Sequence, residues 1–360
     1  MLADLFGDGS GATPQTPDAD TDIAPRARLR HRPRAACDGR MIVRRKLILD
    51  VDTGTDDAVA VMLAALHPAL ELVGCTTVNG NIPVSFCTEN TLRVLDHVGR
   101  DDIPVYEGLT RPIARQDFPV PRRQRDLAGR YHPDILPVPP SARRKQDTGA
   151  VEFLIETYRA ATDPIALVPV APLSNIAAAL ALDPKFVDRV PEVVIMGGAH
   201  AFGNVTPSAE FNIWADPEAA AMVFAAGFAR LTLVPLDATH RALITRDDCA
   251  RLAALGTPAG QAAAAFIGHR VTVHDEHQRQ SIPHSTPVHD ALAVASLVEP
   301  HLITTHRHHV AVETKGDLTV GRTVIDTHGR GGLPPNCHVA FDADAAGFAD
   351  LLLRSFAAKA

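Results

Sequence analysis

The chain has 360 residues, of which 46% are hydrophobic and 21% are charged, and this composition is that of a globular protein with a sizeable core. A formal net charge of −7 and an isoelectric point near 6.2 provide no general basic field, so a nucleic acid is not expected as a partner. No apolar run reaches the roughly eighteen residues of a membrane span, and none of the five cysteines forms a CxxC pair. These features favour a reduced, cytoplasmic protein without a membrane partner.

The first part of the chain differs from the rest in composition. Residues 1–40 are rich in Gly, Pro, Asp, Thr and Arg and lack hydrophobic periodicity, which predicts a disordered extension. Acids stand where a secretory signal would carry bases, and the basic runs at 26–34 and 122–125 are of a kind that is usually solvated. The folded domain is expected to cover residues 41–360, with Met41 as a candidate initiator.

Beyond Met41, short β-rich runs alternate with longer helical patterns. This alternation is typical of βαβ units and predicts an α/β fold, a single domain with a mostly parallel, Rossmann-like central sheet flanked by helices. The Pro- and Arg-rich segment 111–148 is expected to be a long loop. The expected strands are 46–51, 71–78, 165–170, 192–197, 231–236, 308–313 and 337–341. The expected helices are 56–67, 85–99, 149–161, 173–182, 216–226, 258–278, 289–298 and 344–356.

Four aspartates are crowded into the segment LILDVDTGTDDAVA, residues 47–60. Asp50 and Asp52 alternate along an extended strand and therefore face the same side, while Gly54 permits a tight turn into a helix that begins near Asp56. Together with Asp57, they are expected to gather at the carboxyl end of the first strand. Open α/β sheets bind their ligands at that edge.

So many carboxylates at one place require a counter-charge. Two carboxylates about 4 Å apart, at an effective dielectric constant near 20, repel each other by about 4 kcal/mol, and a helix N-terminus offsets at most about 2 kcal/mol. A shared proton or a divalent cation relieves the repulsion, and Ca²⁺ or Mg²⁺ suits a site made of carboxylates. The alternatives are one helix-capping aspartate with solvated neighbours, or the DxD nucleophile pair of dehalogenase-type phosphatases, whose glycine would directly precede Thr53.

Four further segments place polar residues at the ends of expected strands or the starts of expected helices. They are TTVNGNIP (76–83), VPVAPLSNIAAAL (168–180), MGGAHAFGNVTPSAEFNIWADPEAA (196–220) and PVHDALAVA (287–295). Taken singly, each is explained by an Asn turn, a helix cap or a core histidine. Together they bring acids, amides and one imidazole, but no activated serine or cysteine, to the same rim as the aspartates.

In combination, these motifs resemble the inosine-uridine preferring nucleoside hydrolases. The family pattern DxDxGxDDA is matched from Asp50 to Ala58, and TTVxGN is matched from Thr76 to Asn81. The remaining matches are PxGPLTN at 169–175, MGG…GN…AEFN…DPEAA at 196–220 and HDxLAVA at 289–295. The similarity spans residues 45 to about 345 and implies the nucleoside hydrolase fold.

The resemblance also implies roles for individual residues. Ca²⁺ would be bound by Asp52, Asp57, Asp290 and the backbone carbonyl of Val170, with ribose hydroxyls completing the coordination. Asp50 is expected in a supporting role. Further substrate contacts are implied for Asp56, Asn81, Asn204, Glu210 and Asn212.

The implied reaction is hydrolysis of the N-glycosidic bond of a ribonucleoside to free base and ribose. Ca²⁺ would lower the pKa of a water, Asp52 would take a proton from that water as general base, and hydroxide would attack C1′ of the ribose. His289 is expected to protonate the leaving base, since an imidazole titrates near neutral pH. His132 is expected to contact the base, although RYHPDILP (130–137) lacks the glycines of the family's HGxxGL-like run.

Several residues are candidates to contact the base. Segment 271–287 has no tyrosine, although relatives often cover the base with aromatic side chains from this region. His274, His277 and His284 are candidates to replace them, and Phe211 and Trp214 are candidates for stacking or for the core. The preferred base stays open, and the resemblance implies a homodimer or homotetramer.

Two other functions predict sequence features of their own. A Mg²⁺-dependent phosphatase predicts a late lysine followed by an acidic pair, and Lys315 heads no such motif. A non-catalytic nucleoside-binding paralogue predicts the loss of Asp52 or His289, and both are present.

Overall fold

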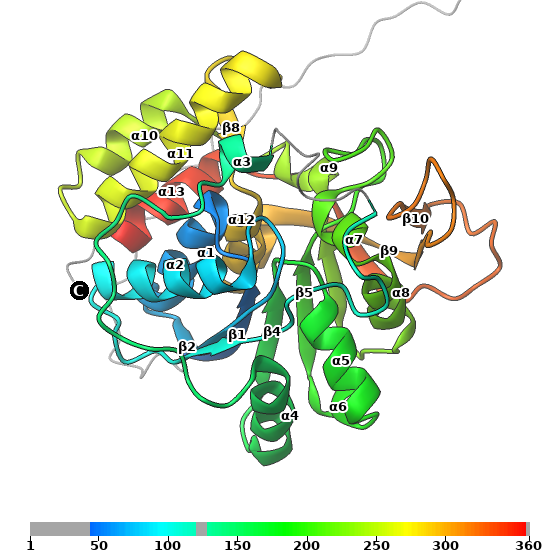
Figure 1. The fold of residues 1–360 in the computed structure, drawn as a ribbon. Helices are drawn as coiled ribbons and strands as arrows, with labels where there is room; N and C mark the ends of the chain where they lie inside the picture. Colours follow the sequence, from blue (N-terminus) through cyan, green and yellow to red (C-terminus); the bar gives the residue numbers. More distant parts are fainter. Residues whose placement is uncertain (1–43, 120–127, 358–360) are drawn as a thin grey trace, which may run out of the picture. The chain divides into compact units, whose positions relative to one another are not determined.

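The computed structural model describes residues 44–119 and 128–357. The expectations for residues 1–40, for Met41 and for the basic run at 122–125 lie outside the described residues. Within these residues, a nine-stranded sheet runs in the order β10-β9-β11-β6-β5-β4-β1-β2-β3 (Figure 1). Its strands are β1 (Arg45–Val51), β2 (Leu70–Thr77), β3 (Val105–Glu107), β4 (Ile165–Pro169), β5 (Glu192–Met196), β6 (Leu231–Val234), β9 (Ile303–Val312), β10 (Thr323–Asp326) and β11 (Cys337–Ala343).

The predicted mostly parallel sheet is confirmed. All neighbouring strands from β3 to β11 pair in parallel, and only β9 runs antiparallel to its two neighbours, β11 and β10. A separate antiparallel pair is formed by β7 (Leu243–Thr245) and β8 (Ser285–Pro287). The carboxyl ends of the parallel strands therefore meet at one edge, where the sequence motifs are located.

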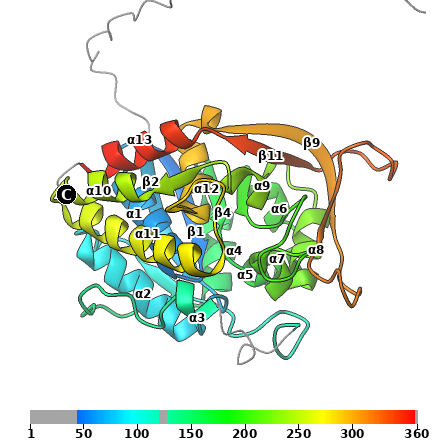
Figure 2. The same cartoon turned by 90° about the horizontal axis from the view of Figure 1, so that it is seen from above.

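Helices cover both faces of the sheet. They are α1 (Thr55–Leu66), α2 (Val84–His97), α3 (Ala128–Tyr131), α4 (Ala150–Ala160), α5 (Ser174–Leu182), α6 (Phe186–Arg189), α7 (Phe211–Ala215), α8 (Pro217–Ala225), α9 (Leu236–Thr239), α10 (Arg246–Ala253), α11 (Pro258–His277), α12 (His289–Val298) and α13 (Ala345–Phe356). Figures 1 and 2 show α1, α2, α10, α11 and α13 on one side of the sheet and α4, α5, α6 and α8 on the other. None of the helices in the described ranges has the length and apolarity that a membrane crossing requires.

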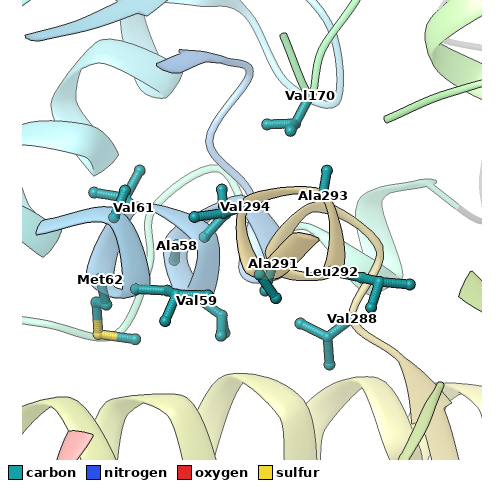
Figure 3. Packing of buried hydrophobic residues seen from close by; sticks show 14 of the residues in the cluster. Ala58, Val59, Val61, Met62, Val170, Val288, Ala291, Leu292, Ala293 and Val294 are labelled. Atoms are coloured by element: carbon teal, nitrogen blue, oxygen red, sulfur yellow. The ribbon is translucent and has the colours of Figure 1, made fainter. Parts of the chain in front are cut away.

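The alternation of side chains along β1 separates the two cores. Leu47 and Leu49 point into the core beneath α1, α2 and α12, whereas Ile48 points into the core beneath α4, α5 and α8. Helix α1 is buried at eleven of its twelve positions, because it is apolar on all sides after its first turn. It packs beside α12, and Figure 3 shows Ala58 and Val59 facing the turns of α12 that carry Ala291 and Val294. Each of these two central helices carries an acidic first turn to the functional edge.

Most expected elements are found within a few residues of their predicted bounds. The expected strand 308–313 is the second half of the longer β9, and the expected loop 111–148 contains the short helix α3. Helices α6, α7, α9 and α10 and strands β3, β7, β8 and β10 were not predicted. Most of these are only three to five residues long, too short to produce a recognisable period. Helix α10 had a usable signal, because the side chains of Thr245 and Asp248 form a capping box at its start.

Candidate active site

Five buried aspartates converge at the carboxyl edge of the sheet. Asp50 is in β1, and Asp52 is the first residue after that strand. Asp56 and Asp57 lie in the first turn of α1, and Asp290 lies in the first turn of α12. All five are between 0% and 4% exposed. The strand–turn–helix geometry that the sequence predicted therefore gathers the acids, and α12 adds one from far along the chain.

Backbone amides hold two of these carboxylates in place. Asp57 accepts hydrogen bonds from the N–H of Asp52 at 3.1 Å and of Gly54 at 3.0 Å. Asp52 accepts one through Oδ2 from the N–H of Asn81 at 2.5 Å, and a Cβ at Gly80 would lie only 2.0 Å from that oxygen. The glycine is thus required because the loop after β2 passes directly over the Asp52 carboxylate.

Asp50 lies behind the others. Its Oδ1 accepts hydrogen bonds from Thr76 Oγ1 at 2.5 Å and from Asn175 Nδ2 at 2.8 Å, and burial raises its pKa to about 7. It is fully buried and does not line the cavity described below. In the phosphatase alternative this first aspartate of the DxD pattern would have to attack the substrate, and its burial argues against that chemistry.

The charge state of the cluster is unfavourable without a counter-ion. Burial, followed by repulsion from Asp57, raises the pKa of Asp52 well above its ordinary value. Burial and then the charges of Asp56 and Asp57 do the same to Asp290, and burial raises the pKa of Asp57 itself to about 6. Oδ1 of Asp52 is buried, and no hydrogen-bond partner for it is found among the described residues. A set of carboxylates with an unsatisfied oxygen fits a hard divalent cation.

Two sets of side chains could hold such an ion. Ligand atoms of Asp56, Asp57 and His132 lie within 4.8 Å of one another, whereas the resemblance implies Asp57 together with Asp52, Asp290 and a backbone carbonyl. Nδ1 of His132 already accepts the N–H of Thr55 at 3.3 Å. The all-oxygen set is therefore the better one for Ca²⁺ or Mg²⁺, and Asp57 belongs to both.

A cavity of about 660 Å³ opens above the aspartates, within the size range of small-molecule sites. Asp52 and Asp57 are not in its lining and lie beneath it. Thirteen of the residues singled out from the sequence line the cavity: Asp56, Asn81, His132, Val170, Asn204, Glu210, Phe211, Asn212, Trp214, His274, His277, His289 and Asp290.

A second cavity, of about 680 Å³, lies beside α4. Its polar lining consists mainly of surface side chains such as Glu152, Glu156 and Arg159, and it includes none of the clustered aspartates. The two cavities are similar in size, so their chemistry, and not their volume, identifies the candidate active site.

The wall opposite the aspartates is formed by α7 and the loop before it. Glu210 caps α7 by accepting the N–H groups of Asn212 at 3.0 Å and Ile213 at 3.3 Å, and burial raises its pKa to about 7. Asn212 donates through Nδ2 to the carbonyl of Val170 at 2.9 Å, and Asn204 accepts the N–H of Phe211 at 2.9 Å. These side chains are fixed to the backbone before any ligand arrives.

His132 reaches the site although its loop lacks the family's glycines. Its ring lies over the turn before α1, and a Cβ at Gly54 would be 1.9 Å from its Nδ1. The loop is anchored by Asn90 of α2, which donates to the carbonyl of Asp134 at 3.2 Å and accepts the N–H of Leu136 at 3.0 Å. A side-chain anchor thus takes the place of the missing glycine turn.

Burial lowers the pKa of three histidines that line the cavity, His289, His274 and His240. His289 shares a 2.7 Å hydrogen bond with Thr239 Oγ1, and burial, followed by the charge of Arg270, lowers its pKa well below the ordinary value. Burial also lowers the pKa of His274 to about 3 and that of His240 to about 4. The near-neutral titration expected for His289 is therefore not what this environment produces.

The structure also separates the candidates for the base region. His274 and His277 line the cavity, whereas His284 does not and instead pairs with Asp275 at 2.9 Å. Phe211 and Trp214 both reach the cavity wall, and Trp214 is only 1% exposed within a small cluster of buried apolar side chains. Trp214 is thus mainly a core residue.

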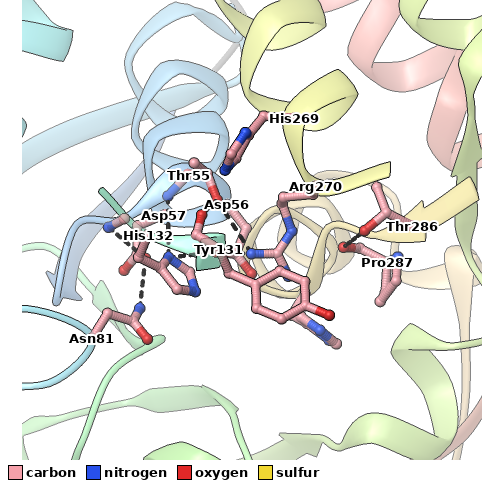
Figure 4. A network of polar contacts seen from close by, with 12 residues as sticks. Thr55, Asp56, Asp57, Asn81, Tyr131, His132, His269, Arg270, Thr286 and Pro287 are labelled. Carbon is pink, nitrogen blue, oxygen red and sulfur yellow. Dashed lines mark hydrogen bonds and ion pairs between the residues drawn. The ribbon is translucent and has the colours of Figure 1, made fainter. Parts of the chain in front are cut away.

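Sequence reasoning missed several residues of the site, among them Tyr131, His240 and Arg270. Tyr131 and His240 line the cavity, and Arg270, on α11, is 3% exposed and binds Asp56 at 2.9 Å (Figure 4). A signal for Arg270 existed. It falls on the same helical stripe as the buried residues Ala263, Ile267 and His274, where an arginine needs a buried partner.

Comparison with known proteins assigns the family. The sequence model of the inosine-uridine preferring nucleoside hydrolases matches residues 47–350. The chain is 40% identical to the pyrimidine-specific ribonucleoside hydrolase RihA of Shewanella woodyi, over 86% of this chain and 97% of that protein. It is 39% identical to the pyrimidine-specific ribonucleoside hydrolase RihB of Escherichia coli O157:H7, over 84% of this chain and 94% of that protein.

Solved structures agree. A purine-preferring ribonucleoside hydrolase from Gardnerella vaginalis superimposes with a TM-score of 0.79 at 31% identity, over 87% of this chain and 98% of that chain. The matches of sequence and of fold remove the phosphatase alternative. The chain belongs to the inosine-uridine preferring nucleoside hydrolase family and is a hydrolase of the N-glycosidic bond of ribonucleosides.

Proposed function

We propose that the protein is a Ca²⁺-dependent hydrolase of pyrimidine ribonucleosides. The observation that carries the metal dependence is the set of buried carboxylates whose pKa values are raised by burial and by one another. The pyrimidine preference is supported by the relatives at 39–40% identity, which are named pyrimidine-specific, whereas the purine-preferring structure is 31% identical.

Asp52, Asp57, Asp290 and the carbonyl of Val170 would hold the cation. When bound, Ca²⁺ offsets the charge of the carboxylates and lowers the pKa of water beside it. Asp52 then accepts a proton from the attacking water through Oδ1, the oxygen for which the described residues provide no hydrogen-bond partner. The hydrogen bond from the N–H of Asn81 to Oδ2 keeps the carboxylate in the orientation that this transfer requires.

The other acids and amides bind the sugar. Asp56, Asn81, Asn204, Glu210 and Asn212 line the cavity and present oxygens and amides to the ribose hydroxyls. As the bond from C1′ to the base stretches, the sugar becomes oxocarbenium-like, and the surrounding carboxylates stabilise its positive charge. Their fixed orientation matters because no reorganisation is then needed during the reaction.

The leaving base requires a proton. His289 lines the cavity, and its hydrogen bond with Thr239 Oγ1 fixes the ring, so we assign it as the donor to the base. His132 lines the same cavity across from it and is assigned as a contact of the base. Because burial keeps His289 mainly neutral, the ring has to take up a proton from solvent before it can pass one to the base, and it returns to the neutral form when the base departs.

A panel of nucleosides with controlled metal tests the proposal. Protein stripped of metal by a chelator is incubated with uridine, cytidine, inosine and a phosphate ester, with and without added Ca²⁺. We expect Ca²⁺ to restore ribose release, with higher kcat/KM for uridine and cytidine than for inosine. Equal turnover with and without metal would contradict the cation role, and a preference for inosine would contradict only the pyrimidine assignment.

A further inference from the structure

A buried arginine outside the cavity lining holds one of the substrate-facing aspartates. We infer that Arg270 is a positioning residue, which fixes the Asp56 carboxylate so that Asp56 can bind the ribose. The inference rests on the proposed function, because it takes Asp56 as a ribose contact. It goes beyond that function by assigning a task to α11, a helix that carries none of the family motifs identified in the sequence.

Among the described residues, both side-chain hydrogen bonds of Arg270 are directed at the start of α1. Its Nη1 donates to Asp56 Oδ1 at 2.9 Å and to Thr55 Oγ1 at 3.2 Å. His132 Nδ1 also lies near Asp56 Oδ1, at 3.8 Å. In the described part of the chain, all polar contacts of the Asp56 carboxylate involve Oδ1, which leaves Oδ2 for a ligand. Figure 4 shows the guanidinium beside Asp56 and under the ring of Tyr131.

The guanidinium acts from behind the wall of the cavity. Asp56 and Tyr131 line the cavity, whereas Arg270 does not, and no lysine or arginine is among the lining residues that the structure describes. A substrate hydroxyl would therefore meet the carboxylate of Asp56 without competition from its counter-ion. This arrangement is that of a residue which acts through another residue.

The same arginine also holds the loop that carries His132. Its guanidinium carbon lies 5.6 Å from the centre of the Tyr131 ring, and Thr55 Oγ1, one of its two acceptors, donates to the carbonyl of Tyr131 at 3.1 Å. The α1 turn, the Tyr131 loop and α11 are thus joined at one point. Loss of the guanidinium would loosen the acid and the neighbouring imidazole together.

Stability alone is a poor reason for this arrangement. The Arg270 side chain is 4% exposed, and its Nε has no hydrogen-bond partner among the described residues. Burying a charged group is costly, and a pair that leaves a donor unsatisfied offsets that cost poorly. Replacing both members of such a pair by neutral side chains is often neutral or stabilising. A positioning role therefore predicts that activity and stability respond differently to substitution.

A double-mutant cycle between Arg270 and Asp56 tests the inference. We expect Arg270→Met to raise KM for uridine and to lower kcat/KM by about 10- to 100-fold, because a displaced binding group is costly even without direct contact. In an Asp56→Asn background, the same substitution should change kcat/KM by less than about threefold, since no carboxylate is left to position. Arg270→Lys, which keeps the charge but not the planar fork, should fall between the two and replaces the Met variant if that variant is unstable.

Arg143 provides the matched control. Its side chain is 24% exposed and pairs with a single aspartate, Asp96, at 2.5 Å, but this aspartate, unlike Asp56, does not line the cavity. Arg143→Met should lower Tm and leave KM and kcat/KM within about twofold of the wild-type values. A purely structural role for Arg270 would give this same pattern, with reduced Tm and unchanged KM, and would overturn the inference. So would a loss that is undiminished in the Asp56→Asn background.

Binding separates this inference from the proposed function. The same cycle is measured by calorimetry as uridine dissociation constants in an Asp52→Asn background, where no turnover is needed. We expect weaker binding on loss of Arg270 when Asp56 is present and no further weakening when it is absent. Wild-type protein that releases no ribose would contradict the proposed function, while the binding cycle would still decide the role of Arg270.

Discussion

Asp183 and the clustered aspartates of the active site lie in opposite electrostatic environments. Asp183, after α5, accepts hydrogen bonds from Arg159 at 2.8 Å and Arg189 at 2.6 Å, and these two guanidinium groups lower its pKa to about 2. In the active site, burial and neighbouring acids raise the pKa of Asp57 to about 6 and also raise that of Asp52 well above its ordinary value. Outside the active site, one aspartate, Asp183, is thus paired with two arginines.

The aspartates of the active site have far fewer positively charged partners. Of the clustered aspartates, Asp56 alone has an arginine partner among the described residues. The remaining charge is left for a cation and a substrate to balance, so the site gives up stability in exchange for the capacity to bind. Three substitutions test this difference, and they are ordered here by the size of the effect that we expect.

The largest effect is expected for Asp52→Asn. It removes the proposed general base and should lower kcat by about 10²- to 10⁴-fold. Because it also removes one of several mutually repelling buried charges, the metal-free variant should melt at or above the wild-type Tm, and Ca²⁺ should stabilise it less than the wild type. Thermal melts of both proteins with and without Ca²⁺ make the measurement. A Tm clearly below that of the metal-free wild type would mean that repulsion among these aspartates does not destabilise the folded protein.

An intermediate effect is expected for His274, which lines the cavity. Burial disfavours the positively charged form of this residue, whereas it disfavours the negatively charged form of the aspartates. The pKa of His274 is about 3, below the ordinary 6.5, so the unfolded chain binds a proton that the folded protein rejects. The stability that neutral His274 contributes is present above about pH 6.5 and is lost as the pH falls below that value. Between pH 7.5 and 5.5, wild type should lose about 1.4 kcal/mol relative to His274→Gln in urea unfolding. Identical pH slopes for the two proteins would rule out this explanation.

The smallest effect is expected for Asp183→Asn. Its pKa is lowered from 3.8 to about 2, mainly by Arg159 and then by Arg189, so the stability from this pairing is fully present above about pH 3.8 and is lost as the pH falls from there through about 2. The variant should therefore melt slightly below wild type at pH 7, with unchanged kcat/KM and unchanged stabilisation by Ca²⁺. A loss of turnover in the Asp183→Asn variant would show that Asp183 and the active-site aspartates are not independent.

Local patterns in the sequence were enough to predict much of this protein. The alternation of β-rich and helical runs predicts a parallel sheet, and a parallel sheet places the ends of its strands at one edge. The spacing of Asp50, Asp52, Asp56 and Asp57 then brings four acids to that edge through a strand and one turn. These inferences succeed because each depends on neighbours a few residues apart, where backbone geometry leaves few choices.

Only the tertiary structure decided which distant side chains complete the site. Arg270 and Asp56 are separated by 214 residues and meet because α11 packs across the start of α1. Likewise, His132 approaches Gly54 because Asn90 anchors its loop, and the same chain fold turns His284 away from the cavity. Contacts of this kind depend on how whole helices pack, and no periodicity in a single segment records which surface a helix will meet.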